Sequence, residues 1–141
     1  VFTYNNYIGQ VYDLQWDDLE VVDDAYEEND SLLGAYDISG NSNTWLSDLS
    51  GTGISRDEDW YEITVEPGAQ RLVSDLRFIH SNGDLELRLY DANNNYVTGS
   101  TSSTDNERID ITLADAGSYY LNVEQFGGSS GNIYDLRWQT C

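Results

Sequence analysis

The sequence predicts an all-β fold, an antiparallel β-sandwich of jelly-roll type with about eight or nine strands. Apolar and polar residues alternate at a period of two in several short segments, which places one face of each segment on a core and the other in water. Clusters of glycine, asparagine, aspartate and serine separate these segments and are typical of turns. The length of 141 residues suits about one domain with its own core.

The predicted strands follow one another along most of the chain. Three of them show strict alternation, at residues 61–65, 85–89 and 109–113. In chain order, all the predicted strands lie near 33–38, 44–49, 61–65, 71–80, 85–89, 95–100, 109–113, 117–126 and 132–139. Helix is expected only as a single turn, near 17–22 or 31–34.

Turn chemistry supports these strand boundaries. Residues 81–84, Ser-Asn-Gly-Asp, are a strong signal for a tight hairpin, and residues 91–95 and 127–131 also interrupt the strands. The Asp-x-Asn-x-Asn pattern of residues 91–95 copies the opening of an EF-hand loop. Tyr96 replaces the glycine of that loop and Ser102 replaces its final glutamate, so we expect a polar hairpin turn instead of a calcium loop.

The charge balance is strongly acidic. Twenty-six acidic residues stand against six basic ones, all of them arginine, for a formal net charge of −20. This composition predicts no basic patch, so nucleic acid and anionic membrane surfaces are poor partners. No run of eighteen apolar residues is present, so no membrane span is expected. A single cysteine excludes an internal disulfide framework.

An internal similarity suggests the domain organisation. Residues 1–16 align without gaps with residues 123–138, at a constant offset of 122 residues. We interpret residues 1–16 as the last strand region of a preceding tandem repeat or as an N-terminal extension. An alternative is one domain that holds two similar strands. Residues 17–30 are then an acidic linker, and residues 31–141 form the sandwich.

Two acidic clusters, at residues 23–31 and 57–61, suggest a metal site. Calcium takes six to eight oxygen ligands from carboxylates, amides and the backbone, whereas zinc or copper would require histidine and cysteine. The chain has one histidine and one cysteine. The clusters therefore favour calcium, and acidic turns with a helix cap but no metal remain the alternative.

Four blocks of sequence carry a family resemblance, at residues 26–31, 57–63, 83–91 and 116–123. In this order and spacing they resemble the bacterial pre-peptidase C-terminal domain, over residues 23–139. The resemblance implies a β-sandwich that is appended, often in tandem, to secreted proteases and other extracellular hydrolases. The collagen-binding domains of clostridial collagenases are related to it.

The resemblance also implies where calcium would bind. Its motifs correspond to Glu27, Asn29, Asp30 and Asp59, and Asp57 substitutes for an aspartate that is spaced differently in the relatives. Ala25 stands where the relatives have a first glutamate, and Asp24 or Glu28 could compensate for it.

The resemblance gives less support to collagen binding by this chain. The positions that present tyrosines in the collagen-binding relatives correspond here to Thr98, Glu124 and Phe126, of which only Phe126 is aromatic. Catalysis is not expected either, because the single histidine, His80, has no accompanying serine or cysteine motif.

The sequence therefore predicts a non-catalytic, calcium-binding accessory domain of a secreted hydrolase, with a protease as the first choice. It would aid folding, domain positioning, or targeting to a substrate or surface. Its expected partners are neighbouring domains of the same polypeptide and an extracellular protein or polysaccharide ligand. The alternatives are a calcium-stiffened structural repeat of an adhesin or surface protein, and a carbohydrate-binding sandwich.

Overall fold

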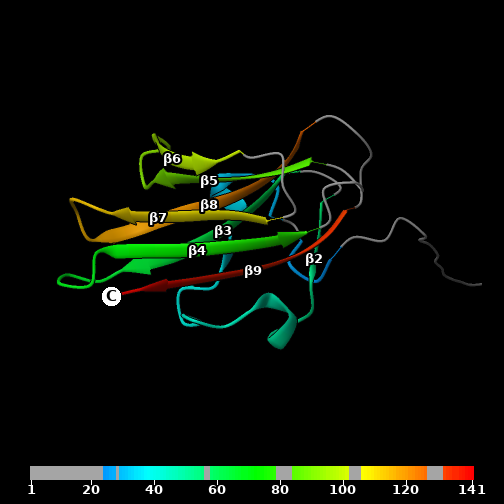
Figure 1. Ribbon diagram of the computed structural model, residues 1–141, viewed down its shortest axis with the longest axis horizontal. Coiled ribbons are helices and arrows are strands. Elements are labelled where there is room, and N and C mark those ends of the chain that lie inside the picture. Colours follow the sequence, from blue (N-terminus) through cyan, green and yellow to red (C-terminus); the bar gives the residue numbers. More distant parts are fainter. Residues whose placement is uncertain (1–23, 28, 56–57, 79–83, 102–105, 127–131) are drawn as a thin grey trace, which may run out of the picture.

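The computed structural model describes residues 24–27, 29–55, 58–78, 84–101, 106–126 and 132–141 (Figure 1). Within these ranges nine strands form two sheets that pack face to face. The strands are β1 Tyr36–Asp37, β2 Gly53–Ser55, β3 Asp59–Val65, β4 Arg71–Phe78, β5 Asp84–Asp91, β6 Tyr96–Ser100, β7 Asn106–Thr112, β8 Gly117–Phe126 and β9 Asn132–Thr140. The predicted all-β sandwich is confirmed.

The order of the strands is that of a jelly roll. One sheet has the order β1-β3-β8-β5-β6 and the other has the order β2-β9-β4-β7. The antiparallel pairs are nested, because β2 pairs with β9, β3 with β8, β4 with β7 and β5 with β6. Nested pairs of this kind result when one long antiparallel ribbon is rolled into two sheets. Strand β1 adds a short parallel partner to the outer edge of β3.

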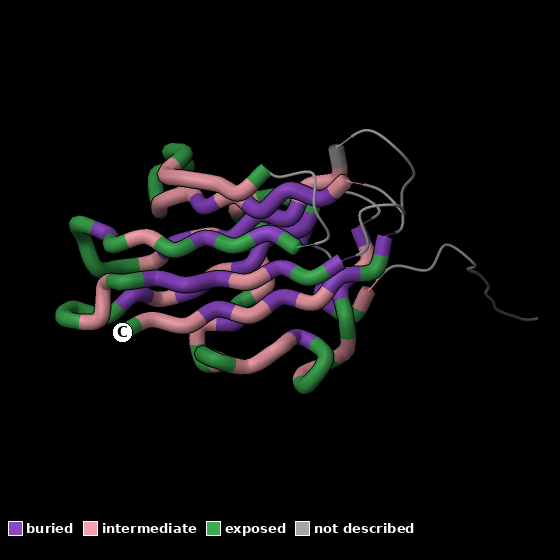
Figure 2. The backbone as a smooth tube through the Cα atoms, viewed as in Figure 1, coloured by how far each residue is buried: buried purple, intermediate pink, exposed green. Residues whose placement is uncertain are grey.

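The core lies between the two sheets and is built by alternation. Along β5, Leu85, Leu87 and Leu89 are each 0 % exposed, while the side chains between them point out of the sandwich. The same alternation is visible along β7 and β9 (Figure 2). Fully burying an aliphatic side chain contributes roughly 1.5–3 kcal/mol relative to leaving it exposed, so this inner face provides much of the stability.

One predicted strand is wrong. Residues 44–49 form a 3₁₀ turn, η3, Leu46–Asp48, in place of the expected strand. Leu46 is fully buried, and the backbone N–H groups of Asp48 and Leu49 donate back to Trp45 and Leu46 within the turn. The segment lies beside β9, where the backbone N–H and side-chain hydroxyl of Ser47 both donate to Asp135. Its apolar residue Leu46 is therefore buried from a turn and not from a strand.

Two shorter elements also differ from the expectation. The strand predicted near 33–38 is reduced to the two residues of β1, which follow a 3₁₀ turn, η2, Leu32–Gly34. This turn matches the predicted helical turn near 31–34. Strand β2, at Gly53–Ser55, was not predicted, because three residues are too few to show a period.

Other expectations lie outside the described residues. They concern residues 1–16, the helical turn near 17–22, most of the hairpin at 81–84, the glycine-rich turn at 127–131, and His80. Within the part of the chain that the structure describes, no helix is long and apolar enough to cross a membrane.

Candidate metal centre

Residues 24–27 are fixed against the sandwich by a buried tyrosine. Tyr26 is 1 % exposed, and its hydroxyl lies 2.9 Å from the Leu46 carbonyl oxygen and 2.6 Å from that of Gly51. Further along, the backbone N–H of Trp60 donates to the Asn29 carbonyl at 2.8 Å. The segment that the sequence assigned to an acidic linker therefore contributes buried side chains next to the start of β3.

Three carboxylates converge where this segment meets β3. Asp24, Glu27 and Asp59 each offer an oxygen atom within 4.8 Å of the others, and Asp59 is fully buried. At 4.8 Å, two unit negative charges repel by about 3 kcal/mol at an effective dielectric constant of 20. Because carboxylates this close repel one another, the three residues form a group that could hold a cation.

The position of Asp24 is set by the backbone. Its Oδ1 accepts a hydrogen bond from the Tyr26 N–H at 3.0 Å, and its Oδ2 accepts one from the Ile54 N–H in β2 at 2.8 Å. A carboxylate oxygen has two lone-pair positions, so these bonds orient Asp24 and still leave acceptor capacity for a cation.

Asn29 lies beside these carboxylates and can offer a fourth oxygen. It is 0 % exposed, and its amide nitrogen donates to the Trp60 carbonyl at 3.3 Å. The other end of the amide lies 2.6 Å from Glu27 Oε2 and 3.2 Å from Asp59 Oδ1. Rotating the amide would let nitrogen donate to both carboxylates, but would then set its oxygen against the Trp60 carbonyl. A cation among the oxygens would satisfy both ends of the amide without rotation.

A hydrogen-bonded pair of tyrosines supports Asp59 from the core. The Tyr134 hydroxyl donates to Asp59 Oδ2 at 2.6 Å and lies 2.7 Å from the Tyr61 hydroxyl. Because Tyr134 uses its proton on Asp59, Tyr61 is the donor in the second bond. Burial raises the pKa of both hydroxyls well above the usual value, so both keep their protons at neutral pH. The pair thereby holds Oδ2 and leaves Oδ1 facing Asn29.

The predicted ligands are only partly brought together. Glu27, Asn29 and Asp59 meet at one point, whereas Asp30 is exposed and is not among the converging carboxylates. Asp57 lies outside the described residues, as does Glu28. Asp24, one of the two residues considered able to compensate for Ala25, occupies the remaining position.

Tyr134 was not predicted to contact the site. It lies in β9, 75 residues beyond Asp59, and no sequence spacing indicates that the two meet. The Tyr-Asp-Leu-x-Trp pattern occurs at residues 12–16 and again at 134–138. It indicated a repeated domain, but it did not indicate that Tyr134 contacts a metal ligand.

The donor set is chemically uniform. Three carboxylates and one amide oxygen are hard ligands that suit calcium or magnesium, and no sulfur or imidazole is among them. The side chains that carry these oxygens lie partly on an irregular segment and partly at the end of a strand. Calcium accepts irregular coordination geometry, whereas magnesium requires a nearly ideal octahedron. The residues therefore fit calcium.

The outer face of the five-stranded sheet carries an aromatic row. The rings of Trp60 and Tyr90 are 4.9 Å apart at 50°, and those of Tyr90 and Tyr96 are 5.7 Å apart at 74°. Trp60 is only 8 % exposed. A flat platform for stacking sugars needs coplanar exposed rings, and this row does not provide one.

The positions that correspond to collagen contacts lie on the same sheet. Thr98 is half-buried on β6, and Glu124 on β8 forms an ion pair with Arg88 of β5. The side chain of Phe126 lies outside the described part of the chain. Because Glu124 is already paired with Arg88, the described residues at these positions do not favour binding of collagen.

Comparison with known proteins agrees with the architecture. A sequence model of the bacterial pre-peptidase C-terminal domain matches residues 57–125, from just before β3 almost to the end of β8. The fold is similar to the 1.0 Å crystal structure of the pre-peptidase C-terminal domain of a collagenase from Bacillus anthracis, with a TM-score of 0.54 and 19 % identity. That similarity covers 70 % of this chain and 90 % of the other. Residues 57–125 therefore match the family of bacterial pre-peptidase C-terminal domains, and the solved structure shows that the fold is shared.

Proposed function

We propose that this chain is a non-catalytic, calcium-binding accessory domain of a secreted hydrolase, most simply a protease. The observation that carries the proposal is the convergence of Asp24, Glu27, Asn29 and Asp59 at one point. The matched family is named for peptidases, and the similar solved domain comes from a collagenase. Both support a protease as the parent protein.

Calcium would act by joining two parts of the chain. Asp24, Glu27 and Asn29 lie in the segment that precedes β1, and Asp59 lies at the start of β3. A cation that binds all four residues fixes the leading segment against the sandwich, and so sets the angle at which any preceding domain leaves it. The accessory role is then positional, which requires no catalytic group in this domain.

An extracellular setting suits such a site. Calcium sites in extracellular modules commonly have dissociation constants of about 10⁻⁴–10⁻³ M, which a partly exposed site with four protein ligand residues can reach. At a calcium concentration of 100 times the dissociation constant, binding to the folded state alone would stabilise the domain by about 2.7 kcal/mol.

Thermal unfolding after chelation tests the proposal. We expect calcium to raise Tm at fixed ionic strength, and magnesium to raise it much less. Asp59→Asn should abolish the calcium response, because it removes a ligand charge without changing side-chain shape. Asp110→Asn is the matched control, since Asp110 is paired with Arg71 on the other sheet, and this variant should keep the response. An equal response to calcium and magnesium in the wild type would contradict the proposal.

A second pair of variants separates the two ligand sets. The sequence resemblance implies Asp30 as a ligand, whereas Asp24 is the carboxylate that lies within 4.8 Å of Glu27 and Asp59. Asp24→Asn should weaken calcium binding in isothermal titration calorimetry, and Asp30→Asn should leave it nearly unchanged. If Asp30→Asn weakened calcium binding and Asp24→Asn did not, the ligand set implied by the resemblance would be the correct one.

The structural repeat of an adhesin or surface protein stays the second candidate. The 122-residue offset between residues 1–16 and 123–138 favours it, because such arrays repeat whole domains. Both candidates share the calcium site, and a catalytic domain in the same polypeptide would decide for the first. The carbohydrate-binding alternative lacks support, because the aromatic row of Trp60, Tyr90 and Tyr96 is not coplanar.

A further inference from the structure

Tyr26 links the candidate calcium site to the turn of residues 46–51, which consists of η3 and the residues that follow it. Its hydroxyl accepts a hydrogen bond from the Ser50 N–H at 3.1 Å, and the hydroxyl oxygen lies 2.6 Å from the Gly51 carbonyl oxygen and 2.9 Å from that of Leu46. Burial raises the pKa of Tyr26, so the hydroxyl keeps a proton that it donates to one of these carbonyls. One core side chain therefore bonds the backbone at both ends of the turn.

The backbone of the 46–51 turn is irregular and depends on such bonds. The N–H groups of Leu49 and Gly51 both donate to the Leu46 carbonyl, at 2.8 and 3.2 Å. Gly51 has a φ of 114°, a conformation that favours glycine. Where backbone groups are not paired along a strand, side chains or water must satisfy them. Tyr26, which is 1 % exposed, does so from inside the core.

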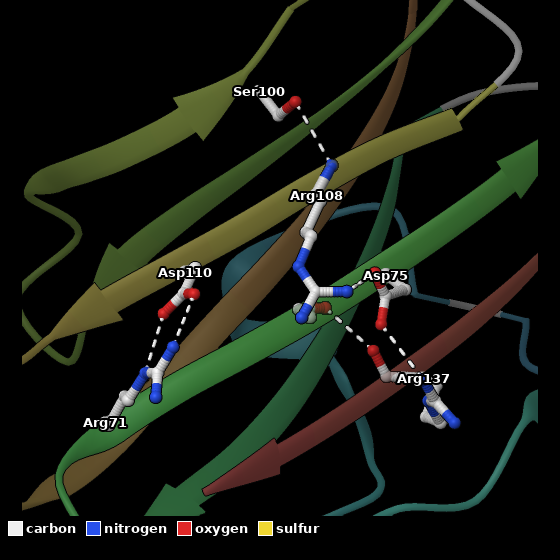
Figure 3. A network of polar contacts seen from close by, with 7 residues as sticks. Arg71, Asp75, Ser100, Arg108, Asp110 and Arg137 are labelled. Carbon is white, nitrogen blue, oxygen red and sulfur yellow. Dashed lines mark hydrogen bonds and ion pairs between the residues drawn. The ribbon is translucent and has the colours of Figure 1, made fainter.

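The outer side of the same turn is held by the four-stranded sheet. The two hydrogen bonds of Ser47 tie it to β9. Trp45, which precedes the turn, has its ring centroid 4.7 Å from the guanidinium carbon of Arg137. Arg137 in turn pairs with Asp75, which also pairs with Arg108, because β4 lies between β9 and β7 (Figure 3). The sheet thus fixes the outer side of the turn, and Tyr26 holds its inner side.

Tyr26 also lies between two of the proposed ligands in the sequence. The carboxylates of Asp24 and Glu27 converge on Asp59, while the Tyr26 ring enters the core and packs edge-on against Tyr61, with the ring centroids 5.7 Å apart. The Tyr26 N–H donates to Asp24 Oδ1 at 3.0 Å. A stretch of four residues cannot leave the sandwich without withdrawing this ring. The positions of both carboxylates therefore depend on where Tyr26 is held.

We propose that Tyr26 is a positioning residue of the calcium site, and that its hydroxyl couples calcium binding to closure of the 46–51 turn. This inference rests on the proposed function. Without a cation, repulsion among the carboxylates of Asp24, Glu27 and Asp59 opposes the closed arrangement, and the Tyr26 hydrogen bonds act against that repulsion. Calcium affinity is reduced by the fraction of molecules that are open. Coupling is reciprocal, so a change that opens the turn must also weaken calcium binding.

Removing the Tyr26 hydroxyl tests the coupling. In Tyr26→Phe the ring stays in the core and no proposed ligand changes, so we expect calcium affinity to fall about fivefold in isothermal titration calorimetry, the effect of one lost hydrogen bond. Tyr119→Phe is the matched control, because Tyr119 is also buried and its hydroxyl donates to a backbone carbonyl, that of Asp115. Tyr119 pairs with Ile63, in the half of β3 away from Asp59. Its loss should change the affinity less than twofold.

Hydrogen exchange at single amides separates this role from a merely structural one. The Leu49 N–H bonds the Leu46 carbonyl within the turn, so removal of the Tyr26 hydroxyl does not break its hydrogen bond directly. Saturating calcium should slow exchange of the Leu49 amide at least tenfold in the wild type and less than twofold in Tyr26→Phe. Amides shared between β4 and β7 report opening of the whole sandwich, and calcium should slow their exchange in both proteins.

The reciprocal test strains the turn and measures calcium affinity. Gly51 and Gly68 both have a positive φ, and a Cβ added at either has nothing within 4 Å, so alanine strains only the backbone. Gly68 lies in the connection between β3 and β4, away from Tyr26. We expect Gly51→Ala to lower calcium affinity at least threefold and Gly68→Ala to change it less than twofold. Circular dichroism confirms that each variant is folded.

Three outcomes would overturn the inference and leave the proposed function intact. The first is wild-type calcium affinity in Tyr26→Phe or in Gly51→Ala. The second is an equal loss of affinity in the matched control, Tyr119→Phe or Gly68→Ala, which would indicate a general effect of lower stability. The third is calcium binding by the wild type without slower exchange of the Leu49 amide. Absence of calcium binding in the wild type would instead overturn the proposed function, and this inference with it.

Discussion

Tyr134 connects the core of the sandwich to the candidate calcium site through one hydrogen bond. It is 1 % exposed, and its hydroxyl donates to Asp59 Oδ2 while accepting from Tyr61. The two tyrosines look alike in burial, but only Tyr134 touches a proposed ligand. Their roles are therefore separable by removing one hydroxyl at a time.

Tyr134→Phe should weaken calcium binding, and Tyr61→Phe should not. Without the Tyr134 hydroxyl, the buried Asp59 carboxylate loses a donor and is less well oriented, which costs about 1–3 kcal/mol of stability. In Tyr61→Phe the bond to Asp59 persists, and only the hydrogen bond between the tyrosines is lost. Calorimetric titration with calcium compares the two variants. Equal affinities would show that Tyr134 does not position Asp59.

Individual site residues were predictable where the signal was local. Glu27 and Asn29 are two positions apart, and Asp59 lies two positions before the alternating segment of residues 61–65, so the short motifs of the family resemblance indicated all three. Asp24 and Glu28 were equivalent candidates in the sequence. Hydrogen bonds to the backbone of Tyr26 and Ile54 hold Asp24 beside Glu27 and Asp59, while Glu28 lies outside the described residues. Tyr134 was beyond prediction, because its contact depends on how the two sheets face each other.

At the scale of the element, strand β2 depends on a residue with no side chain. Gly53 is the cross-strand partner of Tyr134. A Cβ atom at this position would lie 2.2 Å from Tyr134 Cζ and 2.6 Å from its hydroxyl oxygen, much closer than real contacts allow. Glycine therefore lets a short strand close over the buried tyrosine.

Gly53→Ala should destabilise the domain by about 1–3 kcal/mol, the usual cost of overpacking a core. Tyr134 would have to move, so calcium affinity should fall together with stability. Gly40→Ala is the control, because nothing lies within 4 Å of the added atom, and its effect should be small. Urea unfolding of the three proteins measures the difference. An unchanged midpoint in Gly53→Ala would mean that β2 shifts freely and does not depend on the close contact.

Longer strands were easier to predict from the sequence than elements of three residues. The alternation at 85–89 and 109–113 predicted strands that the structure shows as β5, Asp84–Asp91, and β7, Asn106–Thr112. Strand β2 and the turn η3 are three residues each, and their form is decided by tertiary contacts, the packing of Tyr134 and the hydrogen bonds of Ser47 to Asp135. Such contacts leave no periodic pattern in the sequence.

At the scale of the whole molecule, the jelly roll determines how charge is distributed. The sequence predicted the class of fold, and the nested pairing of strands explains the arrangement of arginines that composition could not reveal. The same topology brings Asp24 and Asp59, which are separated by 35 positions, to one point. The 26 acidic and six basic residues together give the molecule a formal net charge of −20, and the repulsion among the acidic residues opposes the compact state.

Screening of this repulsion should stabilise the calcium-free domain independently of the metal site. Raising monovalent salt from 0.1 to 1 M shortens the Debye length from about 10 to about 3 Å. A resulting gain of about 1 kcal/mol would raise Tm by about 4 °C for a chain of this size. Sodium and potassium chloride should act equally, because screening does not depend on the identity of the cation.

The variant Asp59→Asn separates the two effects. It should gain as much Tm from sodium chloride as the wild type, because it removes one of many charges, but it should gain little from calcium. If Asp59→Asn instead lost the response to sodium chloride, the converging carboxylates would be the main source of repulsion. If it kept the full response to calcium, that ion would act on the net charge and not at Asp59.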